Sequence, residues 1–344
     1  MIEILWSNLS KYIKKVNLNG KMYYKLHNVK KVNMIDSKFI PKKVEEYIEN
    51  NIKYKYVISY NYENNIINVN YFCSKKINNT ELFKKIVKRI IFMMIISNTY
   101  KNLNIEIYDT PFKKEFGCNN HKKCGKLSQN NVNSGLSYLN NIIIFRKEEM
   151  LKLLIHELIH ALDIDIKYET NEDKKKLLEL FNVNENNLLV NESYVETWAI
   201  IINLFLVIYE KNVKELEEIK KNLFREYIKK EIVHSFQQCA KLCLYYNIDD
   251  FNKIYKNNKN SIKYEDTVNT FSYHIIKTIN LYNIKNFIKN FSHNKYILPK
   301  KYNFNKYILF IIKYNRTIIN KINYILKNTK KNSKLKSLTM SSIN

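Results

Sequence analysis

The chain has 344 residues, and 58 Lys and Arg against 32 Asp and Glu give it a formal net charge of +26. Hydrophobic residues make up 45% of the chain and aromatic residues 13%, which excludes a largely disordered protein. The four glycines and three prolines argue against collagen-like and propeller architectures and favour long helices. The positive charge fits either a solvated basic surface or an anionic partner, such as nucleic acid or an acidic protein.

The sequence shows neither a secretory signal nor a membrane span. It has an early Glu3 and no basic stretch ahead of a sustained apolar run. The longest apolar run, at 198–209, is shorter than the roughly 18 residues that a membrane span needs. The five cysteines are an odd number in a chain that can bury a large core, which favours reduced thiols. We therefore expect a cytoplasmic protein without a membrane span.

Strands and helices are predicted to alternate in the first half of the chain. Apolar patterning predicts strands at 53–60, 66–73, 104–108, 136–139 and 142–145, the first two joined by a polar hairpin turn at 61–65. Helical periodicity predicts helices from Thr80 to about residue 98 and from about 147 to 165. The stretch at 113–133 is rich in Asn, has no periodicity and is predicted to be a loop.

The second half is predicted to be almost entirely helical. Helices are expected after Thr170 and at 188–210, 213–246, 265–282 and 306–328. The Lys- and Ser-rich end of the sequence has little apolar content. These patterns predict an α+β fold with an N-terminal α+β lobe at 1–165, a helical lobe at 166–328 and a basic disordered tail at 329–344.

The sharpest motif is HELIH at 156–160, inside the apolar stretch MLKLLIHELIHAL. On a helix His156 and His160 lie one turn apart on one face and can bind one metal ion. Glu157 lies about 100° round the helix, where it can reach a water bound to that metal. Burying these side chains in an apolar helix is costly unless they have a partner, so we predict a metal site rather than a chance grouping.

A catalytic zinc site needs three protein ligands and one open position. The stretch NESYVETWA at 191–199 offers Glu192 and Glu196, which lie four residues apart on one face of an apolar helix. Two carboxylates on one buried face repel each other unless a cation or donors lie between them. We predict Glu192 as the third ligand of one Zn²⁺ per chain and Glu196 as the acceptor of a ligand histidine's N–H. A solvated pair at the helix edge is the alternative.

HELIH followed 32 positions later by Asn191-Glu192 resembles zinc metallopeptidases of the gluzincin type, in which a later helix carries a glutamate ligand in a pattern like NExxxD. Glu196 stands where that pattern often has Asp. The resemblance implies a zincin-like fold: an N-terminal lobe with a small twisted sheet and the active-site helix, and a helical lobe that closes a cleft over the zinc.

A wider stretch, from TPFKKEF at 110–116 through VNSGLSY at 132–138 to NESYVETWA, is similar to a family of metallopeptidases predicted in large DNA viruses. This resemblance implies the host cytoplasm or the virion as the location. It also implies that the strand with Gly135, Leu136 and Ser137 pairs with the backbone of an extended peptide. The oxyanion donor is expected to be Tyr273, with His274 and His234 as the other candidates.

Two further groups are weaker candidates. Asp163 lies on the helix face of the two histidines, but three ligands on one straight helix cannot converge tetrahedrally on one ion. A role beside the ligands or at the helix end is therefore expected for it. A CxxHxxC pattern lies in the predicted loop without an evident fourth zinc ligand, and it consists of Cys118, His121 and Cys124. Plain reduced thiols are the default, with a second metal site or a thiol that blocks the zinc as alternatives.

The predicted activity is hydrolysis of peptide bonds in a protein or peptide substrate. Zinc would lower the pKa of its bound water toward about 7, and Glu157 would take the proton so that the hydroxide attacks the carbonyl. The competing class is a non-catalytic basic protein, associated with nucleic acid or the virion, with a structural zinc site. Such a site would not require Glu157, which favours the enzyme. A hydrolase of a non-peptide amide would differ only in pocket shape.

Overall fold

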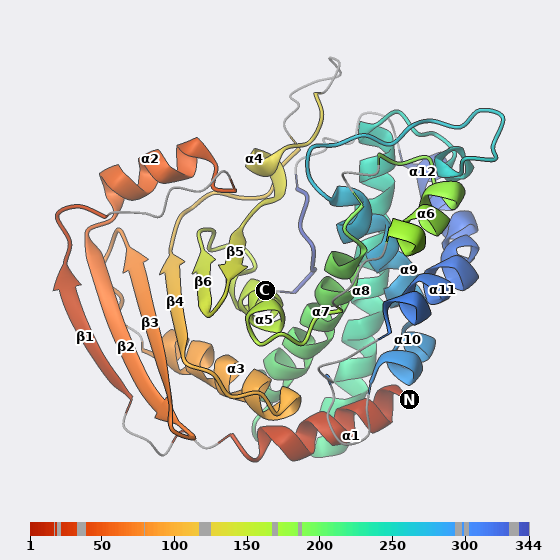
Figure 1. The fold of residues 1–344 in the computed structure, drawn as a ribbon. Coiled ribbons are helices and arrows are strands. Elements are labelled where there is room, and N and C mark those ends of the chain that lie inside the picture. The colour runs from red at the N-terminus through yellow and green to blue at the C-terminus, as the bar shows by residue number, and fades with distance from the viewer. Residues whose placement is uncertain are drawn as a thin grey trace.

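The protein has an α+β fold with one six-stranded sheet and many helices (Figure 1). The computed structural model describes residues 1–16, 18, 22–32, 39–78, 80–116, 125–166, 171–184, 188–292, 298, 303–329 and 337–343. In Figure 1 the sheet lies on one side of the molecule and most of the later helices lie on the other. The coarse prediction of an α+β fold is confirmed.

The sheet is mixed, with the strand order β1-β2-β3-β4-β6-β5. Its strands are β1 (Tyr23–Asn28), β2 (Tyr54–Tyr62), β3 (Asn65–Cys73), β4 (Leu103–Tyr108), β5 (Gly135–Tyr138) and β6 (Asn141–Ile144). β1, β2 and β3 pair antiparallel, β4 pairs parallel with both β3 and β6, and β5 pairs antiparallel with β6. The strand β5 therefore ends the sheet at the edge that faces the later helices (Figure 1).

The two faces of the sheet are covered by different helices. On one face α2 (Lys42–Asn51) closes a small core that includes Val44 and Ile48. On the other face lie α3 (Glu81–Ser97) and α5 (Met150–Ala161), whose apolar side chains belong to the main core. Both α3 and α5 are apolar round most of their surface, which is typical of helices that are buried on several sides.

The α-helices and the π-helix after residue 170 form the second part of the fold. They are α6 (Asn171–Leu180), α7 (Val190–Lys211), α8 (Glu217–Tyr245), a π-helix (Phe271–Ile276), α9 (Lys277–Tyr282), α10 (Ile284–Phe291), α11 (Phe304–Tyr314) and α12 (Ile319–Asn328). The N-terminal α1 (Ile2–Ile13) joins them, because its Trp6 ring packs against Phe205 of α7 and Phe224 of α8. One continuous cluster of buried side chains thus runs from the sheet into the helices.

The helix α7 is long and apolar enough to cross a membrane by length and composition, but 89% of its apolar window is buried inside the protein. This burial is typical of a core helix. The same helix carries Glu192 and Glu196, which face histidines of α5.

Most elements predicted from apolar patterning are present, including the hairpin β2-β3 and the helices α3, α5 and α7. The predicted strands at 136–139 and 142–145 each begin one residue earlier. The helix predicted at 265–282 begins only at residue 271, and its first part is a π-helix. Residues 265–270 instead form a turn around Asp266, whose carboxylate accepts hydrogen bonds from the backbone of Val268 and Thr270.

The prediction of a disordered tail at 329–344 is wrong for residues 337–343. Leu338 is fully buried and Met340 is 3% exposed. These two apolar side chains, two residues apart, both enter the protein interior. Backbone N–H groups of the segment donate hydrogen bonds to buried carboxylates. Composition predicted disorder because Lys and Ser dominate the stretch, but two apolar side chains and buried hydrogen-bond acceptors are enough to fix so short a segment. Residues 330–336 and 344 lie outside the described residues.

Candidate metal centre

The helix α5 carries the HELIH motif between the sheet and α7. Leu154 and Leu158 are fully buried, so the helix is held firmly on its apolar side. Residues 156 and 160 lie one turn apart, and both imidazoles turn toward the start of α7. The motif is therefore fixed on a rigid element, as a metal-binding or catalytic group requires.

His156, His160 and Glu192 meet at one point. The distance from His156 Nε2 to Glu192 Oε2 is 3.2 Å, and that from His160 Nε2 to Glu192 Oε1 is 3.6 Å. One potential ligand atom from each residue lies within 4.8 Å of the others. The three predicted ligands are thus brought together from α5 and α7, with His160 and Glu192 32 positions apart in sequence.

This donor set fits Zn²⁺. Zinc prefers imidazole nitrogen and carboxylate oxygen at about 2.0–2.2 Å, and two donors of a tetrahedral site at that length lie about 3.3 Å apart. The observed separations of 3.2 and 3.6 Å match that spacing. Three protein donors leave a fourth position for water or substrate, which is the pattern of catalytic rather than structural zinc sites.

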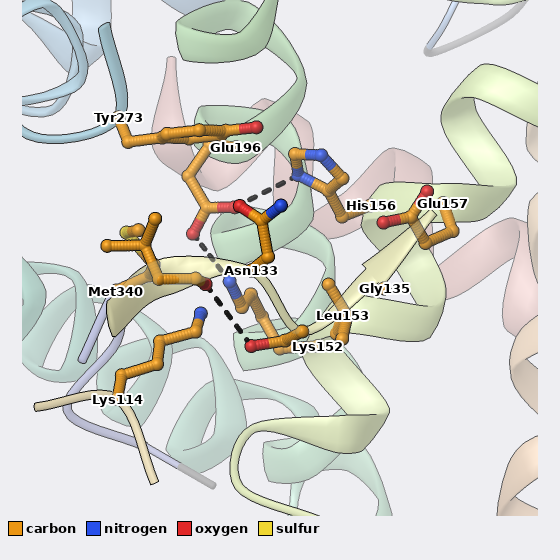
Figure 2. Close-up of a pocket in the computed structure, with 12 residues that line it drawn as sticks. Lys114, Asn133, Gly135, Lys152, Leu153, His156, Glu157, Glu196, Tyr273 and Met340 are labelled. Carbon is orange, nitrogen blue, oxygen red and sulfur yellow. Dashed lines mark hydrogen bonds and ion pairs between the residues drawn. The ribbon is translucent and has the colours of Figure 1, made fainter. Parts of the chain in front are cut away.

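Glu196 contacts the second ring nitrogen of His156, the one that does not face Glu192. Its Oε2 lies 3.0 Å from His156 Nδ1, and its Oε1 accepts a hydrogen bond of 2.6 Å from Lys152 Nζ. Lys152 and Glu196 are 1% and 2% exposed, so this is a fully buried ion pair. A carboxylate on Nδ1 fixes the tautomer that presents Nε2 to a metal. The structure therefore puts Glu196 in the predicted position (Figure 2).

The acidic partner of His160 is Asp165, which the sequence did not single out. Asp165 Oδ2 lies 3.0 Å from His160 Nδ1. Asp163 lies just beyond the end of α5 with a φ of 56° and forms an ion pair with Lys101. The helix ends at residue 161, so the i+7 spacing no longer keeps Asp163 on the face of the histidines. Asp163 thus has the helix-terminal role, and Asp165 has the role beside the ligand.

Glu157 lies beside the ligands and under the edge strand. A methyl group added at Gly135 would lie 3.1 Å from Glu157 Oε1 and 2.9 Å from the carbonyl oxygen of Ile143. Position 135 therefore has no room for a side chain, because the Ile143 carbonyl and the carboxyl group of Glu157 border that space. Leu136 and Ser137 follow on the same edge strand, and both are partly exposed. The predicted base and the predicted substrate strand are direct neighbours.

Burial dominates the electrostatics of these groups. It raises the pKa of Glu157, an effect that His156, His160 and a hydrogen bond with Ser137 only partly offset. Burial also opposes the charged form of Glu192, but the two imidazoles outweigh it and hold the pKa of that carboxylate well below its usual value. Glu157 thus accepts a proton more readily than an exposed glutamate, whereas Glu192 stays an anion that can bind a cation.

Tyr273 reaches the same point from the helical side. Its hydroxyl donates a hydrogen bond of 2.9 Å to Glu192 Oε2, and it belongs to the π-helix at 271–276, a rare geometry that often occurs at functional sites. Burial and the charge of Glu192 raise the pKa of Tyr273 well above its usual value, so the hydroxyl remains a donor. Tyr273 lines the cavity beside His156, whereas the two other candidates, His274 and His234, do not line it.

A cavity of about 50 Å³ adjoins the ligands (Figure 2). The described residues that line it include Gly135, His156, Glu157, Glu196 and Tyr273, together with residues outside the helices and strands such as Lys114 and Met340. This is the place where a reacting group could meet both the predicted base and the predicted oxyanion donor.

Sequence reasoning missed Lys152 and Asp165. Lys152 stands out as the cation in MLKLL, four residues before His156, and this spacing could have identified it as a partner on the same face. Asp165 had no such signal, because its approach to His160 depends on the turn that ends α5. Cys118, His121 and Cys124 lie outside the described residues, and Cys73, Cys239 and Cys243 are buried free thiols.

Comparisons of the whole chain with protein-family models, with curated proteins and with solved structures find no significant match.

Proposed function

We propose that this protein is a zinc-dependent metallopeptidase with a zincin-like fold. The observation that carries the proposal is the convergence of His156, His160 and Glu192 on one point, with Glu157 beside them at a cavity. The packing of α5 against a mixed sheet with an antiparallel edge strand supports the zincin-like arrangement. So does the later helix α7, which brings the glutamate.

In this proposal the three residues hold one Zn²⁺, which supplies Lewis acidity and makes coordinated water acidic near neutral pH. Glu157 accepts the proton of the attacking water and passes it to the leaving amine. Glu196 and Asp165 keep the two imidazoles in the tautomer that presents Nε2. Glu157 is left for proton transfer because the other five side chains hold the metal or the two imidazoles.

Other groups around the cavity would stabilise the oxyanion and bind the substrate backbone. Tyr273 is placed by the π-helix so that its hydroxyl can donate to an oxyanion that forms next to Glu192. The edge strand β5 offers backbone N–H and C=O groups to an extended peptide beside Glu157. A peptide bond is therefore the substrate that this arrangement suits best.

The test is cleavage of dye-labelled casein by the full chain, with Glu157→Gln as the test variant and Glu179→Gln on the exposed face of α6 as its matched control. We expect the wild type and Glu179→Gln to cleave, and Glu157→Gln to retain zinc but lose cleavage. EDTA should abolish activity and Zn²⁺ should restore it. Zinc that binds without any cleavage would favour the competing class, a basic binding protein with a structural zinc site.

A further inference from the structure

Residues 337–343, named here the 337–343 segment, lie between the sheet and the helical part of the protein (Figure 1). The segment begins with an antiparallel bridge between Ser337 and Glu115, and the Leu338 N–H donates to the Lys114 carbonyl at 3.1 Å. The side chain of Leu338 is fully buried. The segment thus adds a short extended strand to a part of the chain more than 200 residues away in sequence.

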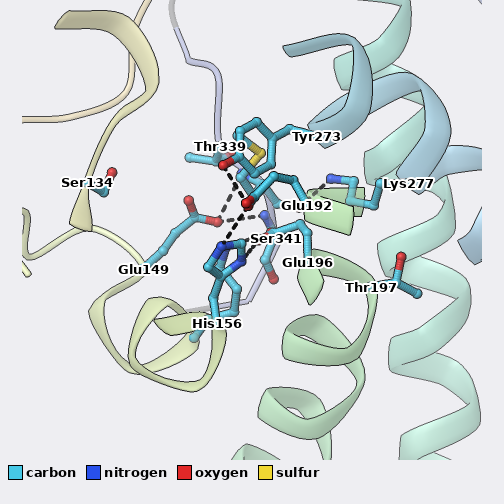
Figure 3. Close-up of polar contacts among 12 residues, drawn as sticks. Ser134, Glu149, His156, Glu192, Glu196, Thr197, Tyr273, Lys277, Thr339 and Ser341 are labelled. Carbon is cyan, nitrogen blue, oxygen red and sulfur yellow. Dashed lines mark hydrogen bonds and ion pairs between the residues drawn. The ribbon is translucent and has the colours of Figure 1, made fainter. Parts of the chain in front are cut away.

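Three buried charged side chains hold the backbone of the 337–343 segment. Glu149 Oε1 accepts the N–H groups of Met340 at 3.0 Å and Ser341 at 2.6 Å (Figure 3). Lys277 Nζ donates to the Met340 carbonyl at 2.9 Å, and Glu231 Oε1 accepts the N–H of Ser342 at 2.9 Å. Each of the three is at most 2% exposed.

These contacts form a built site for a peptide backbone. Charged groups that are buried this deeply need partners. Lys114 Nζ is one partner of Glu149, at 3.0 Å from its Oε2, and main-chain N–H and C=O groups of the segment bind the three side chains as well. Glu231 also accepts the hydroxyls of Ser341 and Ser342, at 2.8 and 2.7 Å. The groove therefore recognises an extended chain with small hydroxyl side chains at these two positions, and any peptide of that kind offers the same groups.

Met340 connects this groove to the metal centre. Its side chain lines the 50 Å³ cavity together with Gly135, His156, Glu157 and Tyr273 (Figure 2). One water needs about 10–15 Å³ of such space, so the cavity holds a few waters but no residue of a substrate peptide. A substrate side chain therefore fits into this cavity only if one of the lining side chains moves. Met340 forms one wall of the cavity, and it is held there by the hydrogen bonds of its backbone to Glu149 and Lys277.

We propose that this groove is a peptide-binding subsite of the metal centre and that the 337–343 segment occupies it as an intramolecular competitor. Substrates would be extended peptides that present an apolar side chain at the position of Met340, followed by Ser or another small hydroxyl residue. Displacing the segment opens the cavity and frees Glu149, Lys277 and Glu231 to bind the incoming backbone. The catalytic consequence of this opening rests on the proposed peptidase function.

A reversible lock tests the proposal in the full chain. Bridged residues of an antiparallel pair have Cα atoms about 4.5–5.5 Å apart, within the range of a disulfide. Glu115→Cys with Ser337→Cys, made in a background with Cys118→Ser and Cys124→Ser, would therefore fix the segment when oxidised with glutathione disulfide and release it with a phosphine reductant. Each single cysteine variant, treated identically, is the control.

Two readouts are made on the locked and the released protein. The first is cleavage of dye-labelled casein, which we expect to be lost on oxidation and recovered on reduction. The second is fluorescence polarisation of a labelled synthetic peptide with the sequence of residues 337–343. This peptide should bind a full-length Met340→Gly variant, whose own segment is weakened, and should not bind the locked protein. Zinc content and circular dichroism confirm that each variant is folded.

The outcomes separate the two proposals. Equal cleavage by the oxidised and reduced protein would overturn the competitor and leave the peptidase standing. A folded Met340→Gly variant that binds no peptide would overturn the subsite. Peptide binding that the lock abolishes, without cleavage in any form, would support the groove and refute the peptidase.

Discussion

The buried pair of Lys152 and Glu196 supports the most quantitative prediction. Their Nζ–Oε1 distance is 2.6 Å, and both are at most 2% exposed. Removing one member of a buried pair leaves an uncompensated charge and costs about 3–5 kcal/mol. We therefore expect Lys152→Met and Glu196→Met each to lower the free energy of unfolding by that amount, a large share of the roughly 5–15 kcal/mol of a typical domain.

The double variant removes both charges and should lose clearly less than the sum of the single losses. Contacting residues give coupling energies of about 0.5–3 kcal/mol in such cycles. Urea denaturation at pH 7 measures all four proteins, with EDTA present so that bound metal does not contribute to stability.

Zinc affinity separates the two roles of Glu196. This carboxylate also accepts from His156 Nδ1 at 3.0 Å, a contact that Lys152 does not make. Glu196→Met should weaken zinc binding about 10–100-fold, and the double variant should match it, whereas Lys152→Met should lose less. Competition with a chromophoric zinc chelator gives these constants. Additive stability losses together with unchanged zinc affinity in Glu196→Met would refute the reasoning.

Three other predictions follow from single contacts. Tyr273→Phe removes one donor, so casein cleavage should fall about 10²–10³-fold at unchanged zinc content, and unchanged cleavage would exclude Tyr273 as the oxyanion donor. Gly135→Ala sets a methyl group 2.9 Å from the Ile143 carbonyl and should reduce cleavage about 10²-fold by shifting the strand, while Gly125→Ala, with no atom within 4 Å, should leave it unchanged. Burial and, second, the charge of Lys277 lower the pKa of His234 in the folded protein to about 4, below its value near 6.5 in the unfolded chain. The contribution of His234 to the free energy of unfolding is therefore fully present above about pH 6.5. Its contribution of about 3 kcal/mol should be lost as pH falls from 6.5 to 4 in urea denaturation, and His234→Gln should show a smaller loss; an equal loss would contradict the assignment.

The sequence carried enough information for elements with a strong apolar period. The hairpin β2-β3 and the core helices α3, α5 and α7 follow from alternation or helical spacing, which burial on one or more sides enforces. The helix α1 was not predicted, because its burial depends on Trp6 meeting α7 and α8 from far along the chain. The π-helix was also missed, since it has the same local pattern as an ordinary helix.

The ligands were predictable for a related reason. His156 and His160 share one helix face by spacing alone, and Glu192 is a carboxylate inside an apolar helix, which calls for a partner. Asp165 was not predictable, because it reaches His160 only after α5 has ended in a turn. The order of the 337–343 segment depends on buried groups such as Glu149 and Lys277, which no local pattern reveals.

The central claim, that His156, His160 and Glu192 bind one zinc ion, is tested most directly by elemental analysis of the purified full chain. The wild type and Glu179→Ala, a change on the exposed face of α6, should each carry one zinc per chain. Glu192→Ala, which removes one of the three donors, should carry none or lose it on dialysis. A wild type that binds no zinc after exposure to Zn²⁺, or a Glu192→Ala protein that retains one zinc per chain, would contradict the account.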